Sequence, residues 1–156
     1  MSNRDPAPVP VTVVVPSYNR PEKLAACLKA LDRQDYPDLE IVVVDDGSET
    51  PLKPTCAPYP QVRGLRQDNQ GPAAARNAGV AAARDGFVAF TDDDCRPRPD
   101  WVSRLVAAHA GDPAALVGGR VENALTENVY SAASQTLCDY LYDYFGATDG
   151  EAPFFT

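Results

Sequence analysis

The sequence predicts an α/β protein in which helices cover both faces of a mostly parallel central sheet, giving three α/β/α layers. Continuous apolar runs stand at residues 11–15 (VTVVV), 40–44 (EIVVV) and 87–90 (FVAF). Runs of this kind are typical of strands that are buried on both faces. Segments with helical spacing separate the runs, and strands that alternate with helices favour a parallel layered sheet.

The first strand and the first helix follow a short leader. Residues 1–10 are polar and rich in proline, and we interpret them as flexible. The strand at 11–15 stops at Pro16. Pro21 fits the first turn of a helix, and residues 22–34 continue that helix with apolar side chains at helical spacing. Its expected inner stripe is Leu24, Cys27, Leu28 and Leu31.

The middle of the chain adds two strands and a helix after the strand at 40–44. Four prolines within 49–61 predict an irregular loop, and 62–67 (VRGLRQ) is a short, weak strand candidate. Residues 71–86 predict a helix, because proline fits its first turn and alanine fills its body. The strand at 87–90 follows this helix directly.

The last third of the chain predicts a helix, a further strand and an aromatic-rich helix. The first of these helices covers 101–110 and is opened by Pro99 and Asp100. ALVGGRV at 115–121 is the strand candidate, and 129–145 is the aromatic-rich segment.

Composition excludes some classes of partner. The chain of 156 residues has 22 acidic and 14 basic side chains, for a net charge of -8. This charge argues against nucleic acid and against anionic membranes as partners. No apolar run approaches the ~20 residues of a membrane span, and the four cysteines form no C-x-x-C pair. We expect a cytoplasmic protein, with peripheral attachment at the inner face of the membrane left open for a longer protein.

Polar clusters follow three of the predicted strands: PSYN (16–19), DDGS (45–48) and TDDD (91–94). The carboxyl ends of parallel strands share one edge of a sheet, where ligands of such folds bind. We therefore expect five carboxylates at this edge, and they would repel one another unless a cation compensated them. Oxygen ligands favour Mg²⁺, Mn²⁺ or Ca²⁺. The five are Asp45, Asp46, Asp92, Asp93 and Asp94.

Two other interpretations of these clusters stay open on this pattern alone. Asp, Gly and Ser are favoured in turns, so that each cluster has a purely structural explanation. Receiver domains also place Asp after strands, where the cluster binds Mg²⁺ and takes up a phosphoryl group.

Four blocks of the sequence resemble the GT-A glycosyltransferases of family 2, in the same order and at similar spacing. The blocks are VTVVVPSYNRPEKLAACLKAL, DYPDLEIVVVDDGS, NQGPAAARNAGVAAA and FVAFTDDDCRPRPDW, within about residues 11–121. The resemblance implies a Rossmann-like GT-A fold, with 11–156 as one domain that is truncated at its C-terminal end. Receiver domains lack the PSYN and GPAAARNAG blocks.

The resemblance also implies an activity. Such enzymes transfer a sugar, with inversion, from a nucleoside-diphosphate sugar to an acceptor hydroxyl, and they use Mn²⁺ or Mg²⁺. We expect a UDP-sugar donor, a hexosyl group, and a saccharide, lipid or protein acceptor. The general base is expected beyond Thr156, so this chain would be the donor-binding half and transfer sugar poorly. A non-catalytic nucleotide-sugar-binding module stays open as the alternative function. A homodimer stays open as the oligomeric state.

The resemblance assigns the first group of site residues to the nucleotide. Pro16, Tyr18 and Asn19 would line the base pocket, with the ring of Tyr18 against the base. Asp45 would accept a hydrogen bond from the uracil imide N–H. Asp46 would face the ribose or the metal.

The resemblance assigns the second group to the diphosphate and the metal. Arg76 would pair with the nucleotide or with the acidic cluster. TDDD matches the D-x-D motif, so Asp94 would bind the metal directly, and Asp92 would contact the ribose or the metal through water. Asp93, between them, is expected among the nucleotide-binding residues, and Cys95 stands where many members have a further Asp.

Overall fold

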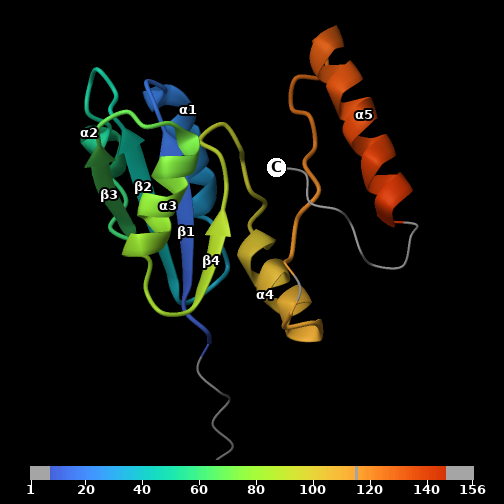
Figure 1. The fold of residues 1–156 in the computed structure, drawn as a ribbon, viewed down its shortest axis with the longest axis horizontal. Coiled ribbons are helices and arrows are strands. Elements are labelled where there is room, and N and C mark those ends of the chain that lie inside the picture. Colours follow the sequence, from blue (N-terminus) through green and yellow to red (C-terminus); the bar gives the residue numbers. More distant parts are fainter. Residues whose placement is uncertain (1–7, 115, 147–156) are drawn as a thin grey trace, which may run out of the picture. The chain divides into compact units, whose positions relative to one another are not determined.

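The computed structural model describes residues 8–114 and 116–146, so most of the predicted leader lies outside the described residues. The chain divides into two compact units, Met1–Ala115 and Leu116–Thr156. The first unit contains the sheet and the helices that flank it, and the second contains one long helix (Figure 1).

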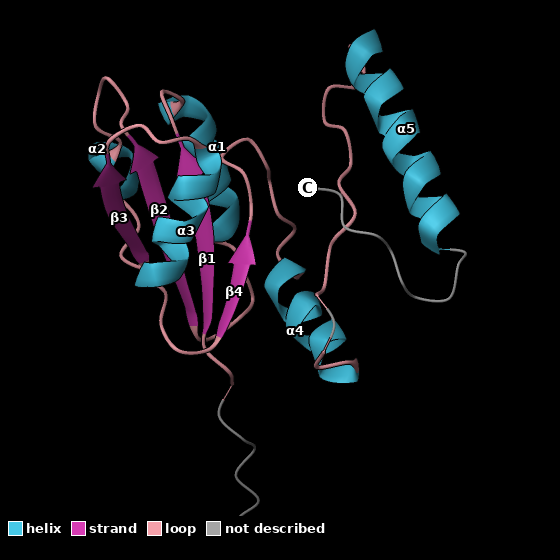
Figure 2. Cartoon of the chain, in the orientation of Figure 1, coloured by secondary structure: helices cyan, strands magenta, loops and turns pink. Residues whose placement is uncertain are grey.

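The strands of the described residues form one sheet in the order β3-β2-β1-β4, and every neighbouring pair is parallel (Figure 2). The strands are β1 (Val11–Ser17), β2 (Leu39–Asp46), β3 (Val62–Gln67) and β4 (Phe87–Phe90). The parallel sheet that the apolar runs predict is confirmed, and the weak candidate at 62–67 is its edge strand β3.

The helices of the first unit lie on both faces of the sheet, so the predicted three layers are confirmed. These helices are α1 (Pro21–Leu31), α2 (Lys53–Cys56), α3 (Pro72–Ala82) and α4 (Trp101–Gly111). Side chains of α1, α2 and α4 share one apolar cluster with the sheet, and α3 forms a second cluster with β2. Figure 1 shows α3 in front of the sheet and α1 behind it.

The larger apolar cluster follows from the alternation of side chains along the strands. Val13 of β1 and Ile41 of β2 point to the face that α1 covers, and both are fully buried. The predicted stripe of α1 closes this core, because Leu24, Cys27, Leu28 and Leu31 are all buried. β1 is buried along its whole length, as its continuous apolar sequence predicts.

The second face is closed by a tight contact between α3 and β1. Gly79 of α3 is buried, and a Cβ atom added to it would overlap the side chain of Val14. Glycine at this position therefore lets the helix approach the strand more closely than any other residue would allow.

Helix α2 lies inside the segment for which the sequence predicts an irregular loop. It is a single turn, with Pro54 at its start, where a missing N–H costs nothing. Leu52 and Cys56 are buried in the large apolar cluster. Burial of these two side chains holds the turn in place. The sequence around them has no helical periodicity that would have predicted this helix.

The strand predicted at 115–121 is wrong for the part that the structure describes, because residues 116–121 belong to no strand. Leu116 is 78% exposed and Val121 is 59% exposed. A strand needs a neighbouring strand for its backbone, and no described strand pairs with this segment, whose Val121 carbonyl instead accepts a hydrogen bond from the side chain of Gln135.

The second unit contains α5 (Val129–Gly146), which confirms the helix predicted at 129–145. Arg120 ties the preceding segment to this helix through an ion pair with Asp143 at 2.6 Å. The guanidinium also lies over the ring of Tyr142. None of the described helices is both long enough and apolar enough to cross a membrane.

Candidate functional site

The three polar clusters lie at the carboxyl edge of the sheet, as the sequence predicts. Ser17 at the end of β1 is opposite Asp45 at the end of β2, and Asp45 is opposite Arg66 of β3. Thr91, after β4, donates its backbone N–H to the carbonyl of Val14 on β1. The parallel register therefore brings PSYN, DDGS and TDDD together.

Asp45 is buried and fully engaged by its own loop. Its Oδ1 accepts the N–H of Ser48 at 2.9 Å, and its Oδ2 accepts the N–H of Leu52 at 3.1 Å. Arg66 Nη1 contacts the same Oδ2 at 2.6 Å. Burial alone would raise the pKa of this carboxyl, but the hydrogen bonds from Ser48, Leu52 and Arg66 outweigh burial and lower the pKa.

Because the pKa of Asp45 is lower in the folded chain than its ordinary 3.8, its ionised form stabilises the fold. That contribution is present above about pH 4 and is lost as the pH falls through the folded pKa. We expect the free energy of unfolding to depend less steeply on pH below about pH 4 in Asp45→Asn than in the unsubstituted chain. Urea titrations at a series of pH values measure this slope.

Asp85→Asn is the matched control for this prediction, since Asp85 is an exposed carboxylate in the turn before β4. It should keep the unsubstituted slope. Equal slopes in Asp45→Asn and Asp85→Asn would contradict the stabilising role of the Asp45 carboxylate.

Asp46 organises the loop that leads into α3. Its Oδ1 accepts the side-chain N–H of Gln67 and the backbone N–H of Gln70, at 2.7 and 3.0 Å. Its Oδ2 accepts the N–H of Gly71 at 2.8 Å. Gly71 is the N-cap of α3, with a positive φ of 87°. Asp46 thus fixes where α3 begins, one turn before Arg76.

The residues predicted to line the base pocket differ in exposure. Pro16 is buried in β1, whereas Tyr18 is 43% exposed beyond the strand end. Asn19, at a left-handed φ of 54°, joins two loops. Its N–H donates to Ser48 Oγ and its Oδ1 accepts the N–H of Glu49. Tyr18 therefore offers a ligand an exposed aromatic ring, whereas Pro16 is closed off in the strand.

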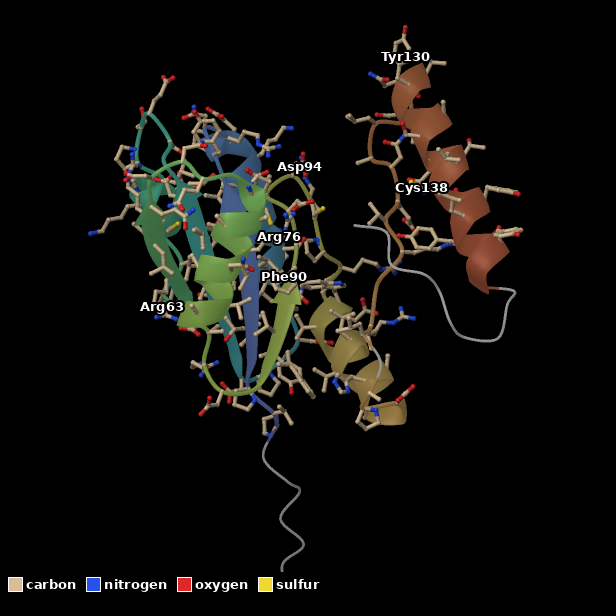
Figure 3. The ribbon with its side chains drawn as sticks, viewed as in Figure 1. Arg63, Arg76, Phe90, Asp94, Tyr130 and Cys138 are labelled. Carbon is tan, nitrogen blue, oxygen red and sulfur yellow. The ribbon has the colours of Figure 1, made fainter. Side chains whose placement is uncertain are left out.

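Asp92 and Asp94 are the exposed carboxylates of the TDDD segment. Arg76 of α3 contacts Asp92 Oδ1 at 2.7 Å, which joins two residues predicted for the site. Asp94 Oδ2 lies 3.3 Å from both Arg20 Nη1, at the N-cap of α1, and Lys23 Nζ, in the first turn of that helix, and the Asp94 side chain is 44% exposed. Figure 3 shows Arg76 on α3 and Asp94 beyond the end of β4.

Asp93 is turned into the protein and is 0% exposed. Its Oδ2 accepts a hydrogen bond from Ser17 Oγ at 2.6 Å and lies 3.3 Å from Arg20 Nε. Its Oδ1 is buried and has no hydrogen-bond partner among the described residues. Burial raises the pKa of this carboxyl, against the opposing effects of Ser17 and Arg20. Asp93 therefore ties the PSYN strand end to the TDDD segment.

Cationic side chains and N–H groups compensate the five carboxylates, so their mutual repulsion does not by itself demand a metal. Sequence reasoning includes Arg76 but misses the other partners, which are Ser17, Arg20, Lys23, Ser48, Leu52, Arg66, Gln67, Gln70 and Gly71. Two of these had a signal in the sequence: Arg20 directly follows PSYN, and Lys23 lies in the first turn of the helix predicted after it.

The donor set suits a divalent cation that a ligand helps to bind. Within the part of the chain that the structure describes, no group of three or more His, Cys, Asp or Glu side chains could hold a metal ion. Mg²⁺ is often bound by one or two carboxylates together with the phosphates of a substrate. Asp92 and Asp94 supply two exposed carboxylates from one short segment, so they are the residues that would hold such a cation together with a phosphate ligand.

Comparison with protein families gives a match over most of the chain. Residues 12–152 match the family model described as Glycosyl transferase family 2.

Curated relatives carry related descriptions. The glycosyltransferase AglE of Haloferax volcanii is 38% identical over 119 residues, which are 72% of this chain and 39% of that protein. The succinoglycan biosynthesis protein ExoO of Rhizobium meliloti is 39% identical over 99 residues, 62% of this chain and 28% of that protein. The chain thus spans about two fifths or less of the length of these relatives.

Solved structures confirm the predicted GT-A fold. The mannosyltransferase PcManGT of Pyrobaculum calidifontis, in complex with GDP-Man and Mn²⁺, is 31% identical, with a TM-score of 0.61. The match covers 68% of this chain and 34% of that one. TarS of S. aureus in complex with UDP-GlcNAc is 25% identical, with a TM-score of 0.61, over 76% of this chain and 38% of that one.

Proposed function

This chain belongs to glycosyl transferase family 2, and we propose that it forms the donor-binding part of an inverting, metal-dependent glycosyltransferase. The donor is a nucleoside-diphosphate sugar, with UDP as the nucleotide, and the acceptor is a hydroxyl group of a saccharide, lipid or protein. The transferred group is a hexose. The four free cysteines support a reducing compartment such as the cytoplasm.

One observation carries this proposal. The carboxyl ends of β1, β2 and β4 bring an exposed aromatic ring, two loop-forming carboxylates and two exposed carboxylates to one edge of the sheet. A nucleotide needs a flat apolar surface for its base, polar groups for its ribose, and positive charge for its phosphates. This edge offers the first two directly and the third through Arg76 and a cation on Asp92 and Asp94.

The nucleotide half of the site is built around Tyr18. Its exposed ring packs against the base. The hydrogen bond from the N–H of Glu49 to Asn19 Oδ1 fixes the backbone next to Tyr18. A carboxylate can accept about four hydrogen bonds. Asp45 already accepts from the N–H and hydroxyl of Ser48, from Leu52 and from Arg66, so the imide N–H of uracil would replace one of these contacts. Pro16 supports the site from within the buried strand β1, and Asp46 anchors the start of α3.

The diphosphate half of the site lies between α3 and the TDDD segment. Arg76 is held by Asp92 at a place where its guanidinium can meet a phosphate oxygen. Asp94 and Asp92 would hold Mn²⁺ or Mg²⁺, which, when bound, neutralises the charge that develops on the leaving nucleoside diphosphate. Asp93 supports both carboxylates from the interior and orients the segment through Ser17.

Calorimetric titration of UDP into the purified chain tests the proposal. We expect binding in Mn²⁺ that is much weaker in EDTA, because the phosphates need the cation between them and the carboxylates. GDP in place of UDP is the comparison for the nucleotide, and we expect it to bind more weakly. Failure of both nucleotides to bind in Mn²⁺ would contradict a donor site, and preference for GDP would contradict a UDP donor.

A further inference from the structure

We propose that Arg20 and Lys23 occupy the carboxylate of Asp94 when the nucleotide is absent, and that they make metal binding depend on the nucleotide. This inference rests on the proposed function, and it concerns the order in which the site fills. Nucleotide and metal would enter together, while the metal alone would bind weakly.

The geometry of the two cations carries the inference. Arg20 Nη1 and Lys23 Nζ both lie 3.3 Å from the same atom, Asp94 Oδ2. A divalent ion that binds this oxygen has to displace both contacts and to approach two positive charges. Both cations come from the first turn of α1 or the residue before it, so they are fixed relative to the end of β1.

Arg20 is held in this place from the interior. Its Nε lies 3.3 Å from Oδ2 of Asp93, a fully buried carboxylate that also accepts the hydroxyl of Ser17 at 2.6 Å. Because the other oxygen of Asp93 has no described partner, the buried charge depends on Ser17 and Arg20 for compensation. Arg20 therefore keeps a second carboxylate partner, Asp93, when it leaves Asp94, whereas Lys23 has no second partner among the described residues.

A diphosphate changes this balance. The negative charge of the diphosphate gives Lys23 and Arg20 an alternative partner to Asp94. The diphosphate also supplies oxygen ligands to the metal. Removal of the cations from Asp94 then costs less, so the nucleotide raises the affinity for the metal. By linkage, the metal raises the affinity for the nucleotide by the same factor.

Lys23→Gln tests the inference, because Lys23 is more than half exposed and its loss leaves the contact between Arg20 and the buried carboxylate of Asp93 intact. Mn²⁺ is titrated into the chain with and without UDP, and electron paramagnetic resonance measures free Mn²⁺. Without UDP, we expect Lys23→Gln to bind Mn²⁺ about two- to fivefold more tightly, which is the range for one exposed ion pair. The factor by which UDP strengthens Mn²⁺ binding should fall correspondingly.

Lys29→Gln is the matched control, since Lys29 is exposed on the same helix and the substitution removes the same charge. It should bind Mn²⁺ as the unsubstituted chain does. If UDP strengthens Mn²⁺ binding in the unsubstituted chain and Lys23→Gln leaves metal affinity without UDP unchanged or weaker, the inference is overturned while the proposed function stands. If UDP does not strengthen Mn²⁺ binding in the unsubstituted chain, both are overturned.

Discussion

Asp94→Ala is expected to weaken the binding of UDP in Mn²⁺ by at least about tenfold, since even indirect support of a metal ligand is worth that much in affinity. Asp94 carries one of the two exposed carboxylates of the TDDD segment, and its neighbour Asp92 is already paired with Arg76. In EDTA the binding of UDP should not fall, because Arg20 and Lys23 keep their positive charge beside the site. Calorimetry in the two buffers measures both effects.

Asp85→Ala is the control for this substitution, because it removes an exposed carboxylate at the opposite edge of the sheet. It should leave UDP binding in Mn²⁺ unchanged. Asp94 is partly exposed, so its removal is not expected to unfold the chain, and circular dichroism checks this. Metal-dependent binding of UDP that survives in Asp94→Ala would remove Asp94 from the metal site.

Gly79→Ala is expected to lower the free energy of unfolding by about 1–3 kcal/mol, the usual cost of extra atoms in a packed core. Helix propensity alone predicts the opposite sign, because alanine is favoured over glycine within a helix by about 1 kcal/mol. Packing outweighs propensity here, since the new Cβ would overlap the side chain of Val14 on β1. Urea unfolding followed by circular dichroism gives the difference.

Gly111→Ala is the matched control, because Gly111 also lies in a helix and no atom comes within 4 Å of its added Cβ. This substitution should leave the stability unchanged or raise it. The double variant Val14→Ala with Gly79→Ala should lose less than the sum of the two single variants, since the shortened side chain on β1 makes room for the Cβ. A Gly79→Ala chain that is as stable as Gly111→Ala would show that α3 does not press on β1.

The elements that the sequence predicted well are those whose local pattern agrees with their burial. The continuous apolar run at 11–15 predicted a strand that the structure buries on both faces, and the stripe of α1 predicted which residues close the core. The run at 87–90 predicted a strand too, but β4 is only partly buried, with Phe90 47% exposed. The failures are segments without such agreement. Residues 116–121 look like a strand, but no strand of the described residues pairs with them. Helix α2 forms where distant parts of the chain bury Leu52 and Cys56 in the large apolar cluster.

The candidate site was also predicted in part: its location was predicted correctly, whereas the direction of individual side chains was not. Strand ends predicted that the polar clusters meet at one edge, since parallel strands leave no other arrangement. No local pattern distinguished the burial of the adjacent aspartates of TDDD, yet Asp93 is fully buried and Asp94 is 44% exposed. The direction of each side chain after a strand depends on the turn that follows, which no local pattern specifies.

The sequence by itself determined the fold class, the family resemblance and the edge of the sheet that carries the polar residues, because periodicity and order along the chain express these properties. Only the tertiary structure decided which side chains form the ion pairs and hydrogen bonds of the site. Arg20 and Lys23 reach Asp94 across more than seventy residues of chain, and Ser17 reaches Asp93 in the same way. Contacts between distant segments depend on the register of the sheet and the placement of α1, and these are set by the packing of the whole core.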